Sequence, residues 1–172
     1  MKRRNRKQHA RYLAYGAIIA AMYAALTHPQ NLLIPNSASM AIQFRASEAL
    51  CVLAFFTPAA VPGLTLGCAL FNLSFAGALP LDALVGSAAT LLAALAMRLT
   101  RKYPLVALAM PAVFNAVLVG WELSMYIGGG FWLNALYVAI GEAAVCYTLG
   151  LLLYGFLKRR GLGRRIFKES PI

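Results

Sequence analysis

Residues 131–157 carry the sequence FWLNALYVAIGEAAVCYTLGLLLYGFL, an apolar run with a single charged side chain, Glu142. An α-helix needs about 20 mostly apolar residues to cross a bilayer, so this run predicts a membrane-spanning helix. The whole chain shares its character, because 61% of the 172 residues are hydrophobic and only 12% are charged. A soluble domain has about 25% charged residues. The composition therefore excludes a soluble enzyme and an ordinary nucleic-acid binder.

Five more apolar runs precede this one, at about 10–27, 46–56, 59–76, 81–99 and 104–127. A polar, proline-containing loop at 29–41 and turns at 57–58, 77–80 and 128–130 separate them. Pro111 predicts a kink in the fifth run. We predict an all-α integral membrane protein, a six-transmembrane-helix bundle that forms one domain over 1–172. The second run is short, and we expect it to be tilted or to span only part of the membrane.

Basic residues fall in three clusters, at 2–11, 98–102 and 158–168, and only Arg45 lies outside them. If the amino terminus is cytoplasmic, six crossings place all three clusters on the cytoplasmic side, as the positive-inside rule requires. The basic tails, about 1–9 and 158–172, are then cytoplasmic. A cleaved signal peptide is the alternative interpretation of the first run, so whether this span is retained stays open.

The sequence predicts no metal, no cofactor and no disulfide framework. The cysteines are scattered through apolar segments without a Cys-x-x-Cys pair, and neither histidine has a partner at ligand spacing. A Gly-x-x-x-x-Gly-Lys-Ser/Thr motif is missing too, so the chain is expected to be neither an ATPase nor another enzyme.

Charged residues inside the apolar runs are the candidates for function. A carboxylate at the bilayer centre costs about 2.5–3.5 kcal/mol on insertion scales, so such groups persist where they pair, protonate or line a cavity. The predicted topology places them in the outer half or near the centre of the membrane. We therefore predict an outward-facing substrate pocket. Its charged and amide residues are Gln43, Arg45, Glu48, Asp82, Asn115, Glu122, Asn134 and Glu142.

Helical spacing groups these candidates. Arg45 and Glu48 are three residues apart and close enough to pair. Asn134, Tyr137 and Glu142 share one face, and Trp132 belongs to an aromatic cluster at the outer end of the last two spans. One arginine against four carboxylates favours a ligand that is cationic or rich in N–H donors.

Structural roles compete with this interpretation for several of these residues. Arg45 and Glu48 can join a loop to a helix, Asp82 can be a helix N-cap, and Asn72 can bond a neighbouring helix. The tryptophans can form an interfacial belt. Glu122 and Glu142 fit a structural role least well, because each lies inside an apolar run.

Small residues recur every fourth position on the first span, as Ala17, Ala21 and Ala25 and as Gly16, Ala20 and Ala24. Such stripes let helices approach closely in lipid. They serve either packing within the chain or docking of another subunit, and periodicity alone does not decide between the two.

The chain resembles the substrate-capture (S) components of energy-coupling-factor (ECF) transporters, and within them the QueT branch. Three segments carry the resemblance: 41–50 with its Gln-Phe-Arg-Ala-Ser-Glu stretch, 56–63, and 131–137 continuing to Gly141-Glu142. The resemblance implies six helices in the plasma membrane of a prokaryote. It also implies binding of a queuosine precursor, a 7-deazaguanine such as queuine or its aminomethyl precursor.

The resemblance further implies partners. An S component works with one transmembrane coupling subunit and two ATPase subunits, and the small residues Ala17, Ala20, Ala21 and Ala24 would dock on the coupling subunit. A proton-coupled secondary transporter of a small cationic or donor-rich molecule is the main alternative, since it also uses buried carboxylates. An intramembrane enzyme and a non-transporting assembly subunit stay open as well.

Overall fold

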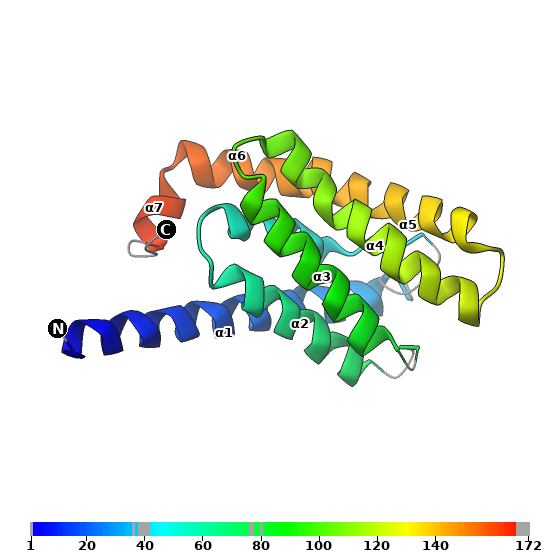
Figure 1. Cartoon of the computed structure of the whole chain (residues 1–172), viewed down its shortest axis with the longest axis horizontal. Coiled ribbons are helices and arrows are strands. Elements are labelled where there is room, and N and C mark those ends of the chain that lie inside the picture. The colour runs from blue at the N-terminus through cyan, green and yellow to red at the C-terminus, as the bar shows by residue number, and fades with distance from the viewer. Residues whose placement is uncertain (1, 36, 38–41, 76–77, 80, 168–172) are drawn as a thin grey trace.

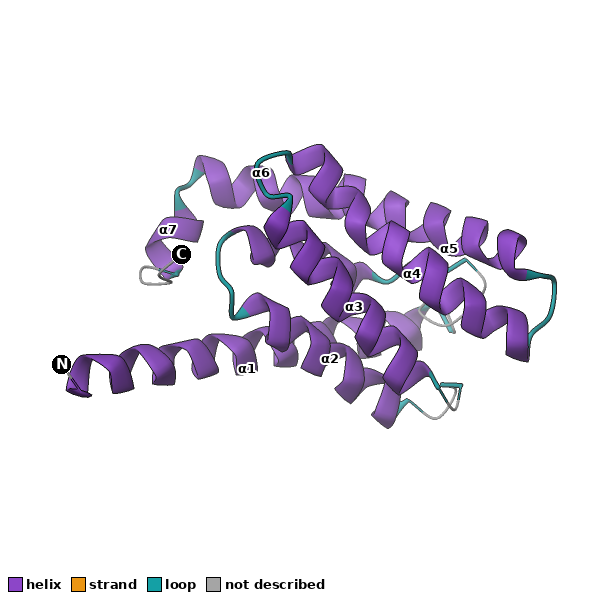
Figure 2. Ribbon diagram, viewed as in Figure 1, coloured by secondary structure: helices purple, strands orange, loops and turns teal. Residues whose placement is uncertain are grey.

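The computed structural model describes residues 2–35, 37, 42–75, 78–79 and 81–167, and in these residues every regular element is a helix. Figures 1 and 2 show a bundle of long, roughly antiparallel helices. The all-α prediction is therefore confirmed. The elements are α1 (Lys2–Leu33), η1 (Ala46–Phe55), α2 (Ala60–Ser74), α3 (Asp82–Leu99), α4 (Pro104–Tyr126), α5 (Phe131–Val145), η2 (Cys146–Gly150), α6 (Leu151–Arg159) and α7 (Leu162–Ile166).

Helix lengths agree with a membrane protein. Within the described residues, four helical stretches are long and apolar enough to cross a bilayer: Arg6–Leu33, Asp82–Leu99, Pro104–Tyr126 and Phe131–Arg159. The last joins α5, the π-helical turn η2 and α6 without a break. The apolar helices η1 and α2 are shorter.

The first helix is longer than the sequence analysis predicted. The loop expected at 29–41 begins only after Leu33, and Pro29 lies inside α1. The side chain of Gln30 holds this last turn, because its Oε1 accepts the Ala46 N–H at 2.8 Å and its Nε2 donates to the Phe44 carbonyl. The rest of the predicted loop, and the predicted turn at 77–80, fall largely outside the described residues.

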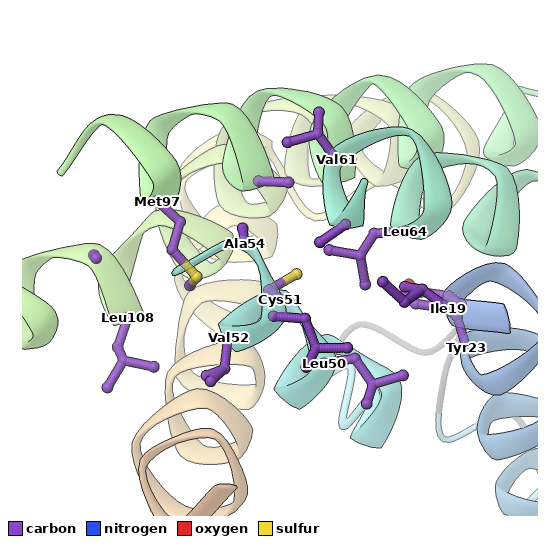
Figure 3. Packing of buried hydrophobic residues seen from close by; sticks show 14 of the residues in the cluster. Ile19, Tyr23, Leu50, Cys51, Val52, Ala54, Val61, Leu64, Met97 and Leu108 are labelled. Atoms are coloured by element: carbon purple, nitrogen blue, oxygen red, sulfur yellow. The ribbon is translucent and has the colours of Figure 1, made fainter. Parts of the chain in front are cut away.

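The short second run is the centre of the bundle. It forms the 3₁₀ helix η1, about 20 Å long at a rise of about 2.0 Å per residue, and every residue from Ser47 to Ala54 is buried. Figure 3 shows its side chains between Leu64 of α2 and Met97 of α3, with Leu108 of α4 nearby. A segment surrounded by other helices does not need to span the bilayer by itself.

Helices α1 and α2 pack through small residues. A Cβ placed on Gly67 would lie 2.8 Å from the Ala20 carbonyl oxygen, and one on Gly63 would lie 3.2 Å from the Gly16 Cα. Ala20 is only 5% exposed because it packs against α2. The four alanines of the predicted docking stripe are therefore not all available to a partner. Ala20 is buried against α2, Ala17 and Ala21 are exposed, and Ala24 is half-buried.

The three basic clusters lie at one end of the bundle. Figure 1 shows the amino terminus, the α3–α4 connection and α6–α7 at that end, and the α1–η1, α2–α3 and α4–α5 connections at the other. Part of the predicted basic tail is a helix, α7, and it folds back on α1. The Tyr15 hydroxyl donates to the Ile166 carbonyl at 2.7 Å, and the Phe167 ring packs edge-on against Tyr15.

Candidate functional site

Buried polar side chains from six parts of the chain lie inside this apolar bundle. They come from the extended segment before η1, from η1 itself, and from α2, α3, α4 and α5, and each is at most 8% exposed. We call them the polar cluster. Its members are Gln43, Arg45, Glu48, Asn72, Asp82, Thr90, Asn115, Glu122 and Glu142.

Glu48 is the best-bonded carboxylate of the polar cluster. Its Oε1 accepts the hydroxyl of Tyr23 on α1 at 2.5 Å and the hydroxyl of Thr90 on α3 at 3.4 Å. Its Oε2 accepts the thiol of Cys51 at 3.1 Å. Buried polar groups are stable when their hydrogen bonds are made, so Glu48 joins α1, η1 and α3.

Arg45 is the one basic residue of the polar cluster, and its guanidinium lies against α2. Its guanidinium carbon lies 5.8 Å from the centroid of the Phe71 ring, and Nη1 donates to the Cys68 sulfur at 3.6 Å. Glu48 and Glu142 both act electrostatically on Arg45, and so does Glu122. Carboxylates on η1, α4 and α5 are therefore near enough to Arg45 to offset its charge electrostatically.

Asp82 and Asn72 organise the start of α3. Asp82 is the first residue of this helix, after the N-cap residue Leu81, and its Oδ2 accepts the Leu79 N–H at 2.6 Å. The N-cap alternative is thus wrong by one residue, because this carboxylate bonds to the turn before the helix. Asn72 donates to the Asp82 carbonyl at 2.8 Å, which confirms that Asn72 bonds a neighbouring helix.

Glu122 and Glu142 differ from Glu48 in their bonding. Both are 0% exposed, and among the described residues no N–H or O–H group donates to either carboxylate. The Glu122 carboxyl lies next to the Asp82 carboxyl and interacts with it, whereas no carboxyl of the described residues hydrogen-bonds to Glu142. Both amide atoms of Asn115 and Oε1 of Gln43 also have no hydrogen-bond partner in this part of the chain. A buried polar group without a partner costs about 1–3 kcal/mol, and more when it is charged. The oxygens of Glu142, the Asn115 amide and Oε1 of Gln43 therefore have hydrogen-bonding capacity that a ligand or water can use.

The structure does not bring every predicted residue to the polar cluster. Trp132 is 83% exposed and packs edge-on against Phe131, as an interfacial aromatic does. Asn134 is buried, but its amide donates to the Gly128 carbonyl at 2.7 Å and so braces the α4–α5 turn. Tyr137 is half-buried.

The sequence analysis did not identify Tyr23 or Thr90 as residues of the site, although both donate to Glu48. Tyr23 and Thr27 are both buried and lie one turn apart on α1, and the Thr27 hydroxyl donates to the Ser47 hydroxyl at 2.7 Å. A pair of polar residues at helical spacing inside an apolar run was the sequence signal that could have predicted this contact.

A model of the QueT transporter family matches residues 13–159. The chain belongs to this family. The match spans all the helices that contribute to the polar cluster, and it agrees with the resemblance drawn from the sequence. Membership of the QueT family makes the chain a membrane transporter protein. No curated protein and no solved structure matches the chain.

Proposed function

We propose that this QueT family member is the substrate-capture S component of an ECF-type ABC importer. It binds a queuosine precursor, a 7-deazaguanine such as queuine or its aminomethyl precursor, from outside the cell for ATP-driven uptake. Energy comes from partner ATPase subunits, since the sequence has no nucleotide-binding Gly-x-x-x-x-Gly-Lys motif of its own.

The observation that carries this proposal is a pair of fully buried carboxylates, Glu122 and Glu142, that accept no hydrogen bond from an N–H or O–H group of the described residues. A guanine-like ring presents a ring N–H and an amino group side by side, and one carboxylate accepts both. The amide of Gln43 or Asn115 bonds the ring carbonyl. A protonated aminomethyl arm pairs with the second carboxylate, which lowers the cost of its burial.

The proposed topology has six membrane crossings with both termini in the cytoplasm of a prokaryote. It is supported by the position of the three basic clusters at one end of the bundle, because basic residues accumulate on the cytoplasmic side. The carboxylates of the polar cluster then lie between the cytoplasmic ends and the outer face. The short helices η1 and α2 count as crossings in this arrangement.

The proposed partners are a transmembrane coupling subunit and two ATPase subunits. The exposed residues Ala17 and Ala21 of α1 form a flat stripe that suits close packing with another helix in lipid. Because Ala20 is buried against α2, the docking surface is narrower than the sequence pattern predicted.

Calorimetry on the purified protein tests the proposed ligand. We expect queuine and 7-aminomethyl-7-deazaguanine to bind, common vitamins not to bind, and the Glu122→Gln and Glu142→Gln variants to bind more weakly. If both variants keep the wild-type affinity, the assignment of the carboxylates is discarded. If no deazaguanine binds, the proposed function itself fails.

The buried carboxylates Glu122 and Glu142 also favour a second candidate, a proton-coupled carrier, because such groups carry protons in transporters. Uptake in cells separates the two functions. Uptake that persists without the ATPase subunits and collapses with the proton gradient supports the carrier. Uptake that requires the ATPase subunits supports the importer.

A further inference from the structure

The extended segment before η1 brings two polar side chains into the bundle. Gln43 and Arg45 are each 2% exposed, whereas Ile42 and Phe44 are 40% and 47% exposed. This alternation is that of an extended chain, in which successive side chains point to opposite sides. Arg45 confirms the conformation, with φ −100° and ψ 94°. The position of the backbone at 43–45 therefore sets where both inward side chains lie.

A glycine on α5 holds this backbone from one side. A Cβ placed on Gly141 would overlap the Gln43 carbonyl oxygen and would lie 2.8 Å from the Gln43 carbonyl carbon and 3.1 Å from its nitrogen. Real Cβ atoms do not approach backbone atoms this closely. The segment thus crosses α5 directly on Gly141, the residue that precedes Glu142 in the chain, and Arg45 of this segment interacts electrostatically with Glu142.

Gln30 at the end of α1 holds the same segment from the other side. Its amide accepts the Ala46 N–H at 2.8 Å and donates to the Phe44 carbonyl. The Phe44 N–H in turn donates to the Ser37 carbonyl at 2.9 Å. Residues 43–46 are therefore fixed between α1 and α5, and the contact with α5 depends on a missing side chain.

We propose that Gly141 and Gln30 are positioning residues for ligand binding: they seat the segment 43–46 so that Gln43 and Arg45 face Glu142. This inference rests on the proposed function, and it adds residues that do not themselves touch the ligand. Gly141 acts by letting the Gln43 backbone approach α5, and Gln30 acts by bonding the backbone on either side of Arg45.

The chain offers a matched control for Gly141. Gly155 lies on the same continuous helical run, and a Cβ placed there meets nothing within 4 Å. Gly141→Ala and Gly155→Ala gain the same helix propensity, but only the first displaces the Gln43 backbone. Two readouts are taken on each purified variant: calorimetric affinity for 7-aminomethyl-7-deazaguanine, and hydrogen–deuterium exchange of the amides at 43–46.

We expect Gly141→Ala to weaken binding about tenfold or more, the scale of one lost ligand hydrogen bond to a charged group, and to speed exchange at 43–46. Gly155→Ala should leave both readouts within twofold of wild type. Wild-type affinity in Gly141→Ala overturns the inference, even if exchange is faster, because the position of residues 43–46 then does not affect ligand binding.

A double-mutant cycle separates positioning from general damage. If Gly141 acts through Gln43, the affinity of the double variant Gly141→Ala/Gln43→Ala equals that of the single variant with the lower affinity. Additive losses overturn the inference, because they show that the two positions act independently.

Gln30→Ala keeps the test decisive if Gly141→Ala does not fold. It must also weaken binding and speed exchange at 43–46, and unchanged affinity overturns the inference. If the wild-type protein binds no deazaguanine, the proposed function fails. Hydrogen–deuterium exchange alone then tests whether Gly141 holds residues 43–46 in place. Faster exchange at 43–46 in Gly141→Ala then supports this positioning role, and unchanged exchange overturns it.

Discussion

Two carboxylates of the polar cluster, Glu48 and Glu142, are equally buried but bonded differently. Glu48 accepts hydrogen bonds from Tyr23, Thr90 and Cys51, whereas Glu142 has no hydrogen-bond partner among the described residues. Both act on the same guanidinium, that of Arg45. Burial of a charge in an apolar bundle is therefore not by itself a sign of ligand binding. The hydrogen bonds distinguish a group that holds the fold from one that is available to a ligand.

The difference follows the architecture. Glu48 lies on η1, the central helix, where α1 and α3 both supply hydroxyl donors. Glu122 and Glu142 lie on α4 and α5, and no hydroxyl or thiol of the described residues donates to either of them. We therefore expect substitutions at Glu48 and its donors to lower the stability of the fold, and substitutions at Glu122 and Glu142 to lower the affinity for the ligand.

The largest effect is expected for Glu48→Ala. It removes the acceptor of three donors and a neighbouring negative charge of Arg45, and breaking a buried charged pair costs about 3–5 kcal/mol. We expect a clear loss of thermal stability in detergent, measured by the unfolding midpoint. A midpoint equal to that of the wild type would show that Glu48 does not hold the helices together.

Glu142→Gln should show the opposite pattern. The amide removes a buried charge without breaking a hydrogen bond from a donor in the described residues, so the unfolding midpoint should fall far less than in Glu48→Ala. Affinity for 7-aminomethyl-7-deazaguanine should fall by about 1.5–3 kcal/mol, the value of a hydrogen bond to a charged group. Calorimetry and melting of one sample test both parts. Lower stability with intact affinity would reverse the comparison between Glu142 and Glu48.

Tyr23→Phe sharpens the comparison with a smaller change. It deletes only the hydroxyl that donates to Glu48 at 2.5 Å, so we expect a loss of about 1.5–3 kcal/mol in stability. Thr90→Val is the matched variant, and its 3.4 Å hydrogen bond should contribute less. Equal losses in denaturant titrations would indicate that distance does not rank the two donors.

The smallest effect on the isolated chain is expected for Ala21→Leu on the exposed face of α1. Surface substitutions change stability by no more than about 0.5 kcal/mol, and binding to the polar cluster should stay unchanged. Co-purification with the coupling subunit should be lost, since a bulky side chain prevents close helix packing. Ala144→Leu, at another exposed alanine, is the control. Equal co-purification of both variants would remove Ala21 from the docking surface.

Much of the fold was predictable because hydrophobic runs and their breakers are local features. The starts of α3, α4 and α5 lie within one residue of the predicted positions, since Pro104 opens a helix readily and the glycines at 128–130 adopt positive φ. The end of α1 was predicted too early, because a contact with a distant segment, through Gln30, holds the helix beyond Pro29.

The candidate site was predictable only in part. Glu122 and Glu142 stood out because a lone charge inside an apolar run is costly wherever it lies. The inward position of Tyr23 and the exposure of Trp132 depend on which face of each helix meets its neighbours. The division of the alanine stripe between Ala20 and Ala21 depends on the same choice.

By itself the sequence determined the class of protein, the approximate helices and the charges that need an explanation, because each of these depends on local composition and spacing. Only the tertiary structure decided which of those charges have partners. A hydrogen bond between Tyr23 and Glu48, or the passage of Gln43 across Gly141, joins residues far apart in the chain. Such contacts depend on the packing of whole helices.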